Sequence, residues 1–504
     1  MVLKRKLIIA LCMVLTILIG SMSVVNAAPP YKSYTYSTVV GYTWVAPSPV
    51  PYIPVQVIDS RSLGVELKQP EDIFRDKDGN FYIADAGTNS IIITDKDWNT
   101  KKVIKNFQNG DKLDTFNKPN GVFVTEEGSI YVADTENSRI VELSNDGELI
   151  RILEKPESDV FKEEFKYYPR KIILDNANRI FVVARGVYEG IMELDYDGIF
   201  SGFIGSNKVT FNAADMFWKR IYTKEQRDKM IQFIPIEYNN FCLDNSGFIY
   251  AVTANDSNNK PIKKLNPSGK DVLRRSGLVK SVSGDLVTSS TGVSITGVSN
   301  FVDICVDEFD VYNALDSKRG RIFSYDADGN LLYVFGNINT NQVGTFKNPT
   351  AIELVGDNLI VADGGLGRIT IFEMTEYAKL IRLGVTQYAN GEYEESIDTW
   401  NKVLKYNANY DLAYVQIGKT LLRQGYTKDS LEYFKLARFR GSTDSGYSKA
   451  FTEYRKDFLR DNFAVIATVL AVAIILLVTF KKIRKKRKAA NRQGVVVLEG
   501  GEGA

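Results

Sequence analysis

The segment QPEDIFRDKDGNFYIADAGTNSIIIT, residues 69–94, decides the fold because the chain repeats it. It recurs as KPNGVFVTEEGSIYVADTENSRIVEL, residues 118–143, at an offset of 49 residues. Each copy contains an apolar strand, a polar turn, a second strand, a loop and a third strand. Four weaker copies begin at Tyr168, Glu237, Asn300 and Asn348. A period of about 40–50 residues with four short strands per unit predicts the blades of a six-bladed β-propeller, a mainly β fold.

The best-formed copy resembles a known family. The pattern P-x-G-V-x-V…G-x-I-Y-V-A-D…N-S-R-I over Pro119 to Ile140 is similar to an NHL repeat, and the resemblance covers about residues 55–375. It implies an NHL-like six-bladed propeller that serves as a binding platform or, less often, as an enzyme. Copies three to five depart from the pattern, with Arg185 where the second copy has Asp134.

The sixth copy lacks a fourth strand, whereas a spare strand, PVQVIDS, precedes the first copy. We predict that Val55 to Asp59 completes the sixth blade, because closing the ring removes exposed sheet edges.

A second repeat follows over residues 376–445. Gly384 and Gly418 align two segments at an offset of 34 residues, and the pattern resembles two TPR units. The small residues allow paired helices to approach closely. Two copies are fewer than a free solenoid needs, so we expect them to lean on a neighbouring part of the chain.

The two ends of the chain carry apolar runs. Residues 1–27 are typical of a signal peptide, with Lys4, Arg5 and Lys6 before an apolar run from Leu7 to Ile19 and a cleavage site that ends at Ala27. An uncleaved N-terminal anchor is the alternative. Residues 463–480 contain no charge and predict a transmembrane helix, joined to the TPR units by a juxtamembrane helix over 446–462. The tail 481–504 begins KKIRKKRK, which predicts a cytoplasmic end and an exported body in a single-pass protein of the cell membrane.

Composition excludes several kinds of chemistry. The chain has no histidine, so Ser-His-Asp triads, Cys-His pairs and His-ligated zinc sites are excluded. The basic residues gather at the two ends and leave an acidic body, which argues against nucleic acid as a partner. The three cysteines, one of them in the N-terminal apolar run, exclude a disulfide scaffold.

Three segments outside the repeats need a separate interpretation. Residues 28–54 are rich in Pro and Tyr and predict an extended linker or surface strap. Residues 207–235 predict a helical insertion with Trp218 and Lys219 exposed, and residues 277–299 predict a polar loop insertion. By strand counting, both insertions lie on one face of the propeller and the TPR helices on the other.

The residues that open each first strand predict a ring around the channel mouth. Its charged and amide members are Glu71, Asp72, Asn120, Arg170, Lys171, Asn239, Asn240 and Asp303. With Trp218 and Lys219, they form the predicted ligand site for a polar molecule such as a carbohydrate. The alternative is that these groups only solvate the channel and pair with one another.

Two functions follow. The first is a non-enzymatic receptor or scaffold outside the membrane, whose TPR units contact a membrane protein, and no cofactor is expected. The second is a calcium-dependent, lactonase-like hydrolase, as in some propellers of similar shape, with Glu71, Asn120, Asn239 and Asp303 as oxygen ligands. Lys171 and Arg170 in the same ring argue against the ion.

Overall fold

The structure is a computed structural model. It describes residues 29–39, 42–158, 161, 166–205, 237–253, 260–279, 281–286, 297–338, 342–437 and 445–498. The predicted signal peptide and the helical insertion, with Trp218 and Lys219, lie outside these residues. The described chain divides into two compact units, of which the first ends at Ala413 and the second begins at Tyr414.

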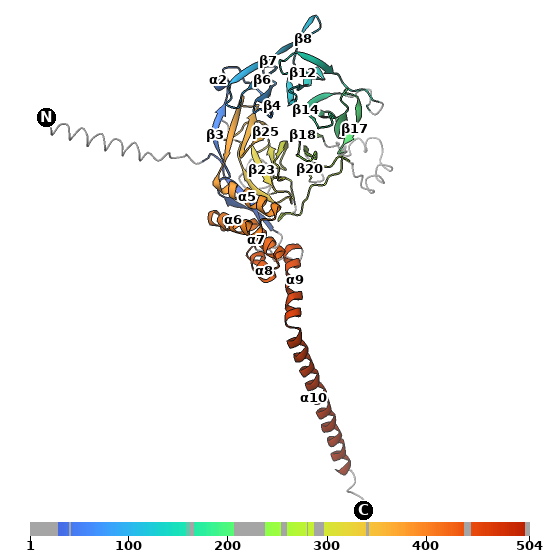
Figure 1. Cartoon of the computed structure of the whole chain (residues 1–504). Coiled ribbons are helices and arrows are strands. Elements are labelled where there is room, and N and C mark those ends of the chain that lie inside the picture. Colours follow the sequence, from blue (N-terminus) through green and yellow to red (C-terminus); the bar gives the residue numbers. More distant parts are fainter. Residues whose placement is uncertain are drawn as a thin grey trace, which may run out of the picture. The chain divides into compact units, whose positions relative to one another are not determined.

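Six antiparallel sheets form a ring in the first unit and confirm the predicted propeller (Figure 1). Blades one to three have four strands each: β4 Pro70–Arg75, β5 Phe81–Asp85, β6 Ser90–Thr94, β7 Thr100–Ile104; β10 Pro119–Val124, β11 Ile130–Asp134, β12 Arg139–Leu143, β13 Leu149–Leu153; β14 Tyr168–Leu174, β15 Ile180–Arg185, β16 Ile191–Leu194, β17 Phe200–Ile204. Blade four has β18 Tyr238–Leu243, β19 Ile249–Thr253 and β20 Ile262–Leu265. Blade five has β21 Phe301–Val306, β22 Tyr312–Asp316, β23 Arg321–Tyr325 and β24 Leu331–Phe335, and blade six has β25 Pro349–Val355, β26 Asn358–Asp363 and β27 Arg368–Met374.

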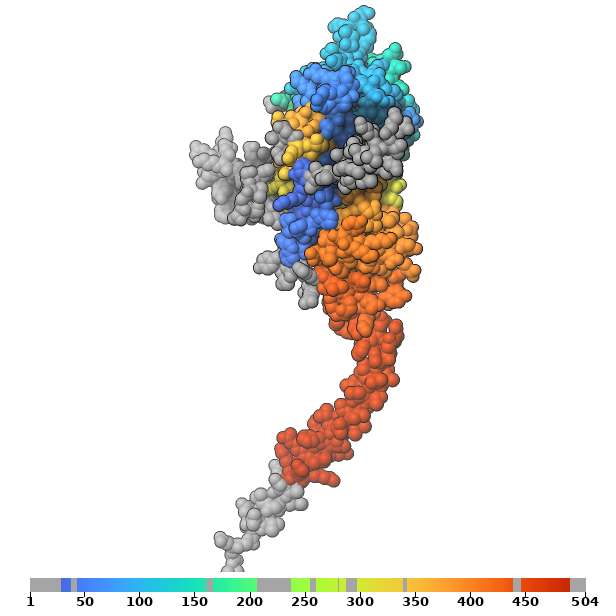
Figure 2. All heavy atoms as spheres, turned by 90° about the vertical axis from the view of Figure 1, so that its left-hand side faces the viewer, coloured from blue at the N-terminus to red at the C-terminus, as the bar shows by residue number. Residues whose placement is uncertain are grey.

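The ring closes as the strand count predicts. Strand β3, Tyr52–Ile58, pairs antiparallel with β27 and becomes the fourth strand of blade six. The N-terminal end of the propeller is therefore hydrogen-bonded to its C-terminal end. Figure 2 shows the early strands, in blue, against the yellow and orange residues that come some 300 positions later.

Residues 28–54 were predicted as an extended linker or surface strap, and most of their described part forms paired strands attached to the propeller. Strands β1, Ser33–Val39, and β2, Tyr42–Ser48, form a hairpin, and β1 pairs with β24 at Tyr34 and Val334. The hairpin thus extends blade five to six strands. Residues 33–37 of β1 are all buried, and Tyr34 and Tyr36 among them pack into the core of blades four and five. The many prolines of this segment lie mostly outside the paired residues of β1.

Tight turns at the ends of the strands follow one repeated chemistry. In the turn after β4, the Asp76 carboxylate accepts the backbone N–H of Asn80 at 2.7 Å, and Gly79 adopts a positive φ of 88°. Asp175, Asp244, Asp307 and Asp326 accept the N–H four residues later in the same way. An Asp or Asn side chain that closes its own turn in this manner is a local folding signal.

The aspartates of the Y-V-A-D motif are also structural. Asp85 accepts the N–H groups of Lys68 and Gln69, and Asp363 accepts those of Lys347 and Asn348. Each carboxylate fixes the loop that leads into the first strand of its own blade. The motif is lost at Arg185, whose guanidinium lies 4.6 Å from the Tyr168 ring centroid and forms an ion pair with Glu136.

The described part of the predicted loop insertion, residues 277–279 and 281–286, forms no helix or strand. Residues 277–286 run along blade five: the N–H of Leu278 donates to Asn330, and Val282 is buried in the core cluster of blades four and five. The N–H of Gly284 likewise donates to the Tyr325 hydroxyl at 3.2 Å, and that of Leu286 to the Tyr36 hydroxyl at 2.9 Å. Residues 287–296 lie outside the described residues.

Shorter elements complete the first unit. Helix α2, Ser60–Leu63, follows β3, and the 3-10 turn η1, Thr135–Asn137, follows β11. A hairpin of β8, Asn106–Asn109, and β9, Lys112–Thr115, projects between blades one and two (Figure 1). Its base is fixed by Arg139, whose guanidinium donates two hydrogen bonds to Asp114 at 2.8 and 2.9 Å.

The C-terminal helices contain the predicted TPR pattern. They are α5 Glu376–Asn390, α6 Tyr393–Tyr406, α7 Asp411–Arg423, α8 Thr427–Leu436, α9 Ser445–Asp461 and α10 Phe463–Leu498. The Ser396 hydroxyl donates to the Gly384 carbonyl at 3.0 Å, and the Ser430 hydroxyl donates to the Gly418 carbonyl at 2.8 Å. A Cβ on Gly384 would come within 2.8 Å of the Trp400 ring, so only glycine permits this helix contact.

The first helix pair, α5 and α6, is attached to the propeller by ion pairs. Arg382 of α5 forms ion pairs with Asp307 at 3.0 Å and with Asp357 at 2.8 Å. These aspartates lie in the turns between the first and second strands of blades five and six. The helices are therefore attached at the face of these turns, whereas the connections between blades lie at the opposite end of the first strands.

Candidate functional site

Each first strand carries a β-bulge at the predicted channel mouth. The register of the first and second strands shifts between Pro70 and Asp72, and at the equivalent point in the five other blades. The bulged residues are all half-buried: Glu71, Asn120, Arg170, Asn239, Val302 and Thr350. The residues that follow them are all buried: Asp72, Gly121, Lys171, Asn240, Asp303 and Ala351. The predicted ring therefore has two layers, of which only the outer one is accessible.

An ion pair spans the inner layer. The Lys171 ammonium of blade three lies 2.7 and 2.9 Å from the two carboxylate oxygens of Asp72 in blade one. Asp72 also accepts the N–H of Val122 in blade two at 3.0 Å, so one carboxylate joins three blades. Burial disfavours the charged ammonium, but the charges of Asp72 and Asp303 outweigh it and raise the pKa of Lys171. The neighbouring carboxylates therefore favour the charged form of Lys171.

Two further carboxyl groups share this region. Burial raises the pKa of Asp303 to about 7 and that of Glu353 to about 8, and the charge of Lys171 opposes both shifts. Asp303 accepts the N–H groups of Ile304 and Ile352 at 2.8 and 2.7 Å, which is the role that Asp72 has toward blade two. Burial likewise raises the pKa values of Cys242 and Cys305, which are free thiols. The inner layer can gain or lose a proton near neutral pH.

Replacing Glu353 by glutamine tests this proton uptake. Because both folded-state pKa values lie above those of unfolded carboxyls, the folded chain binds more protons between about pH 4 and 8. The free energy of unfolding should therefore fall as pH rises from about 4 to about 8 and level off above that. Glu353→Gln should make this decline less steep. At pH 9 the free energy of unfolding of the variant should be higher than that of the unchanged chain by on the order of 2 kcal/mol. Urea unfolding from pH 5 to 9 measures it, and parallel curves for the two proteins would contradict it.

Much of the outer layer is occupied by bonds within the ring. The Asn239 amide donates to the Phe301 carbonyl of the next blade at 2.6 Å, and the Thr350 hydroxyl donates to the Pro70 carbonyl at 2.7 Å. Glu71 accepts a hydrogen bond from Gln69 at 2.6 Å. Asn120 and Arg170 are the ring members with no side-chain hydrogen bond or ion pair within the described chain.

The residues of the predicted calcium site are placed around this ring. Glu71, Asn120 and Asn239 belong to the outer layer and Asp303 to the inner one, with the Lys171 ammonium beside them. Within the described residues, no group of three or more Cys, Asp or Glu side chains has the geometry of a metal site. The Lys171 ammonium already supplies a positive charge among these side chains. They therefore fit this ammonium better than a divalent metal ion.

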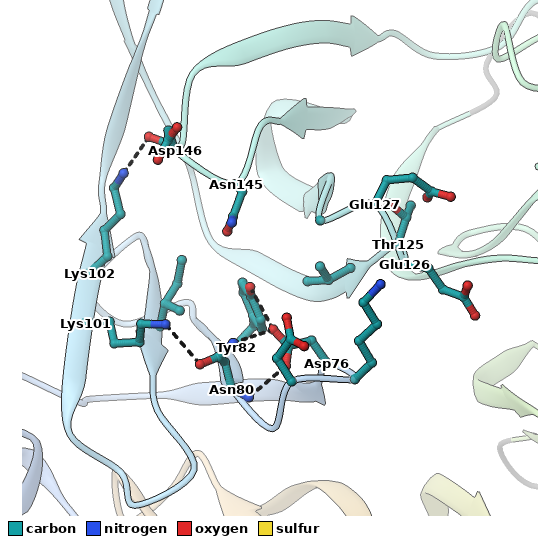
Figure 3. Close-up of a pocket in the computed structure, with 15 residues that line it drawn as sticks. Asp76, Asn80, Tyr82, Lys101, Lys102, Thr125, Glu126, Glu127, Asn145 and Asp146 are labelled. Carbon is teal, nitrogen blue, oxygen red and sulfur yellow. Dashed lines mark hydrogen bonds between the residues drawn. The ribbon is translucent and has the colours of Figure 1, made fainter.

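A second polar site was not predicted from the sequence. A cleft of about 550 Å³ lies between blades one and two, at the end of the first strands opposite the channel mouth (Figure 3). Its lining includes the carboxylates Asp76, Asp78, Glu126, Glu127 and Asp146 and the ammonium groups Lys77, Lys101 and Lys102. Lys101 donates to Asn80 at 3.1 Å and Lys102 to the Asp146 carbonyl. The signal for this cleft was the pair of charged turns at 76–80 and 125–128.

Comparisons with known proteins agree with the repeats. The family model "SMP-30/Gluconolactonase/LRE-like region" matches residues 69–161, and the TPR repeat model matches residues 384–425. The chain is a six-bladed β-propeller with a TPR segment. Residues 69–161 of this propeller are therefore similar to the SMP-30/gluconolactonase family. No curated protein matches the sequence.

Solved structures with this architecture are only distantly similar. Virginiamycin B lyase from Staphylococcus aureus is 12% identical with a TM-score of 0.38, covering 64% of this chain and 99% of its own. The extracellular domain of a protein described as a hybrid two-component system from B. thetaiotaomicron is 15% identical with a TM-score of 0.38, covering 65% and 44%. At these scores, no residue role is transferred to this chain.

Proposed function

We propose that this chain is a membrane-anchored binding protein that holds its propeller outside the cell. The observation that carries the proposal is helix α10. Residues 463–480 are apolar, and none of the span Phe463–Ala489 is buried by the described chain. An apolar helix of this length that no protein surface covers is stable in a bilayer. The basic residues that follow it favour a cytoplasmic C-terminal end by the positive-inside rule.

The propeller face supports recognition better than catalysis. Its inner layer is closed by the Lys171–Asp72 ion pair, and its outer layer presents the amide of Asn120 and the guanidinium of Arg170 to solvent. Groups of this kind bind hydroxyl and carboxylate groups, as in a carbohydrate or a protein partner. The TPR helices provide a second surface, for a neighbouring membrane protein. The proposal therefore has two binding surfaces on one anchor.

A binding array tests the propeller face. We expect the full chain in nanodiscs to bind a polar glycan or an acidic peptide, and the combined change Asn120→Ala and Arg170→Ala to reduce binding at least tenfold. Lys101→Ala, which changes the cleft at the other end of the same blades, is the matched control and should bind as the unchanged chain does. Binding that is lost with Lys101→Ala and kept without Asn120 and Arg170 would assign the site to the cleft instead.

A further inference from the structure

A polar groove lies directly above the membrane-spanning part of α10. It has a volume of about 460 Å³ and is formed between the start of α8 and the last two turns of α9. Its lining includes Lys428, Asp429, Asp457, Arg460 and Asp461, together with the rings of Tyr426, Tyr454 and Phe458. All these residues belong to the second compact unit, as does α10.

In a bilayer, this groove lies at the level of the lipid headgroups. Asn462, which lines it, immediately precedes Phe463, the first residue of the apolar run. At about 1.5 Å rise per residue, the groove residues of α9 extend about 12 Å above that point. The polar layer of a bilayer begins where its hydrocarbon ends. If the chain is anchored as proposed above, on which this inference rests, the groove opens among the headgroups.

Both signs of charge are present in the groove. Arg460 pairs with Asp457 at 3.0 Å and with Asp461 at 3.2 Å, and all three side chains remain at least one-third exposed. The side chains of Lys428 and Asp429 have no hydrogen bond or ion pair within the described chain. Three carboxylates against two cations disfavour a purely anionic ligand. Aromatic rings beside carboxylates favour a cationic group, and Arg and Lys favour a phosphate.

Small side chains lie on one face of α10 near its start. Ala464, Ala467 and Ala471, here called the alanine furrow, are spaced by three and four residues and therefore share a helix face. Helix α9 ends at Asp461 and α10 begins at Phe463, and the backbone of Asn462 joins them by donating its N–H to the Phe458 carbonyl and accepting the N–H of Ile466. Small side chains at these exposed positions leave room for an acyl chain beneath the polar groove.

We infer that this groove binds one zwitterionic phospholipid with a primary ammonium, of the phosphatidylethanolamine class. Its phosphate is held by Arg460 and Lys428, its ammonium by Asp457, Asp461 and the aromatic rings, and one acyl chain by the alanine furrow. A primary ammonium donates hydrogen bonds to the carboxylates, which a choline group does not. The lipid fixes the orientation of α8 and α9 at the membrane surface.

Native mass spectrometry of the full chain, extracted from membranes and mixed with lipids of matched acyl chains, tests the inference. We expect one retained phosphatidylethanolamine, with phosphatidylcholine and phosphatidylglycerol bound at least tenfold more weakly. The variant Asp457→Asn with Arg460→Gln should weaken retention at least tenfold. The matched control Glu453→Gln with Lys456→Gln removes an ion pair of the same i, i+3 spacing outside the groove and should change nothing.

Other outcomes would overturn the inference. Equal binding of the three lipids, or equal losses in both double variants, would show nonspecific lipid. A dimer mass without lipid would show that a second copy occupies the face. As a second variant, Ala467→Leu fills the furrow without changing charge and should weaken lipid but leave binding of soluble glycerophosphoethanolamine unchanged. Recovery of the chain in the soluble fraction would instead contradict the proposed membrane anchor.

Discussion

Replacing Lys171 by methionine is expected to destabilise the propeller by about 3–5 kcal/mol. The change leaves the Asp72 carboxylate, which is 2% exposed, without its cation in the middle of the ring. Asp303 and Glu353 also lose the positive charge that opposes their raised pKa values. Chemical unfolding of the purified chain, followed by the near-ultraviolet signal of its tyrosines, measures the loss.

Two controls separate the lost charge from the lost side chain. Arg170→Met changes the neighbouring residue in the accessible layer and should stay within about 0.5 kcal/mol of the unchanged chain. Adding Asp72→Asn to Lys171→Met removes the uncompensated charge and should restore part of the stability. If Lys171→Met were no more destabilising than Arg170→Met, the ion pair across the channel would not hold the blades together.

A second large effect is expected at Asp285. This buried carboxylate forms ion pairs with Arg319 at 3.0 Å and Arg321 at 2.6 Å, and it accepts hydrogen bonds from the hydroxyls of Tyr34 and Tyr36. Asp285→Asn leaves Arg321 without its anion and Arg319 with only Asp316 at 3.8 Å, which costs about 3 kcal/mol. Because both tyrosines belong to β1, the hairpin of β1 and β2 should also separate from blade five.

Hydrogen exchange distinguishes local release from general unfolding. In Asp285→Asn, the amides of β1 should exchange much faster, while those of β22 and β23 keep most of their protection. The control is Asp328→Asn, which removes an exposed ion pair with Arg274, worth at most about 1 kcal/mol. Unchanged protection of β1 in Asp285→Asn would mean that the hairpin is held by its tyrosine packing alone.

The repeated part of the fold was predictable because the local sequence signals recur with the same period as the blades. Alternating apolar residues, turns closed by Asp76 and its equivalents, and glycines such as Gly79 all repeat with the blade. The closing strand was found by counting, since a ring with one missing strand and one spare strand has a single solution. The TPR pairing was predictable because Gly384 and Gly418 lie where two helices pack closely together.

The parts that were missed depend on tertiary contacts. Prolines made residues 28–54 resemble a linker, whereas burial of Tyr34 and Tyr36 decides their pairing with blade five. Val282 lies in a polar segment, and its burial depends on a blade far away in sequence. The channel residues were predicted as a ring, but which of them pair was not, because the bulge sets the accessible and buried layers and the sequence shows no bulge.

Selective labelling of single cysteines in intact cells tests the central claim most directly. In a chain whose own cysteines are serines, one cysteine replaces Lys96, an exposed residue of blade one, and in a second chain one replaces Lys482, beyond the apolar run. A membrane-impermeant maleimide should label the first in intact cells and the second only after lysis. Labelling of Lys482→Cys but not of Lys96→Cys in intact cells would place the propeller inside and contradict the account.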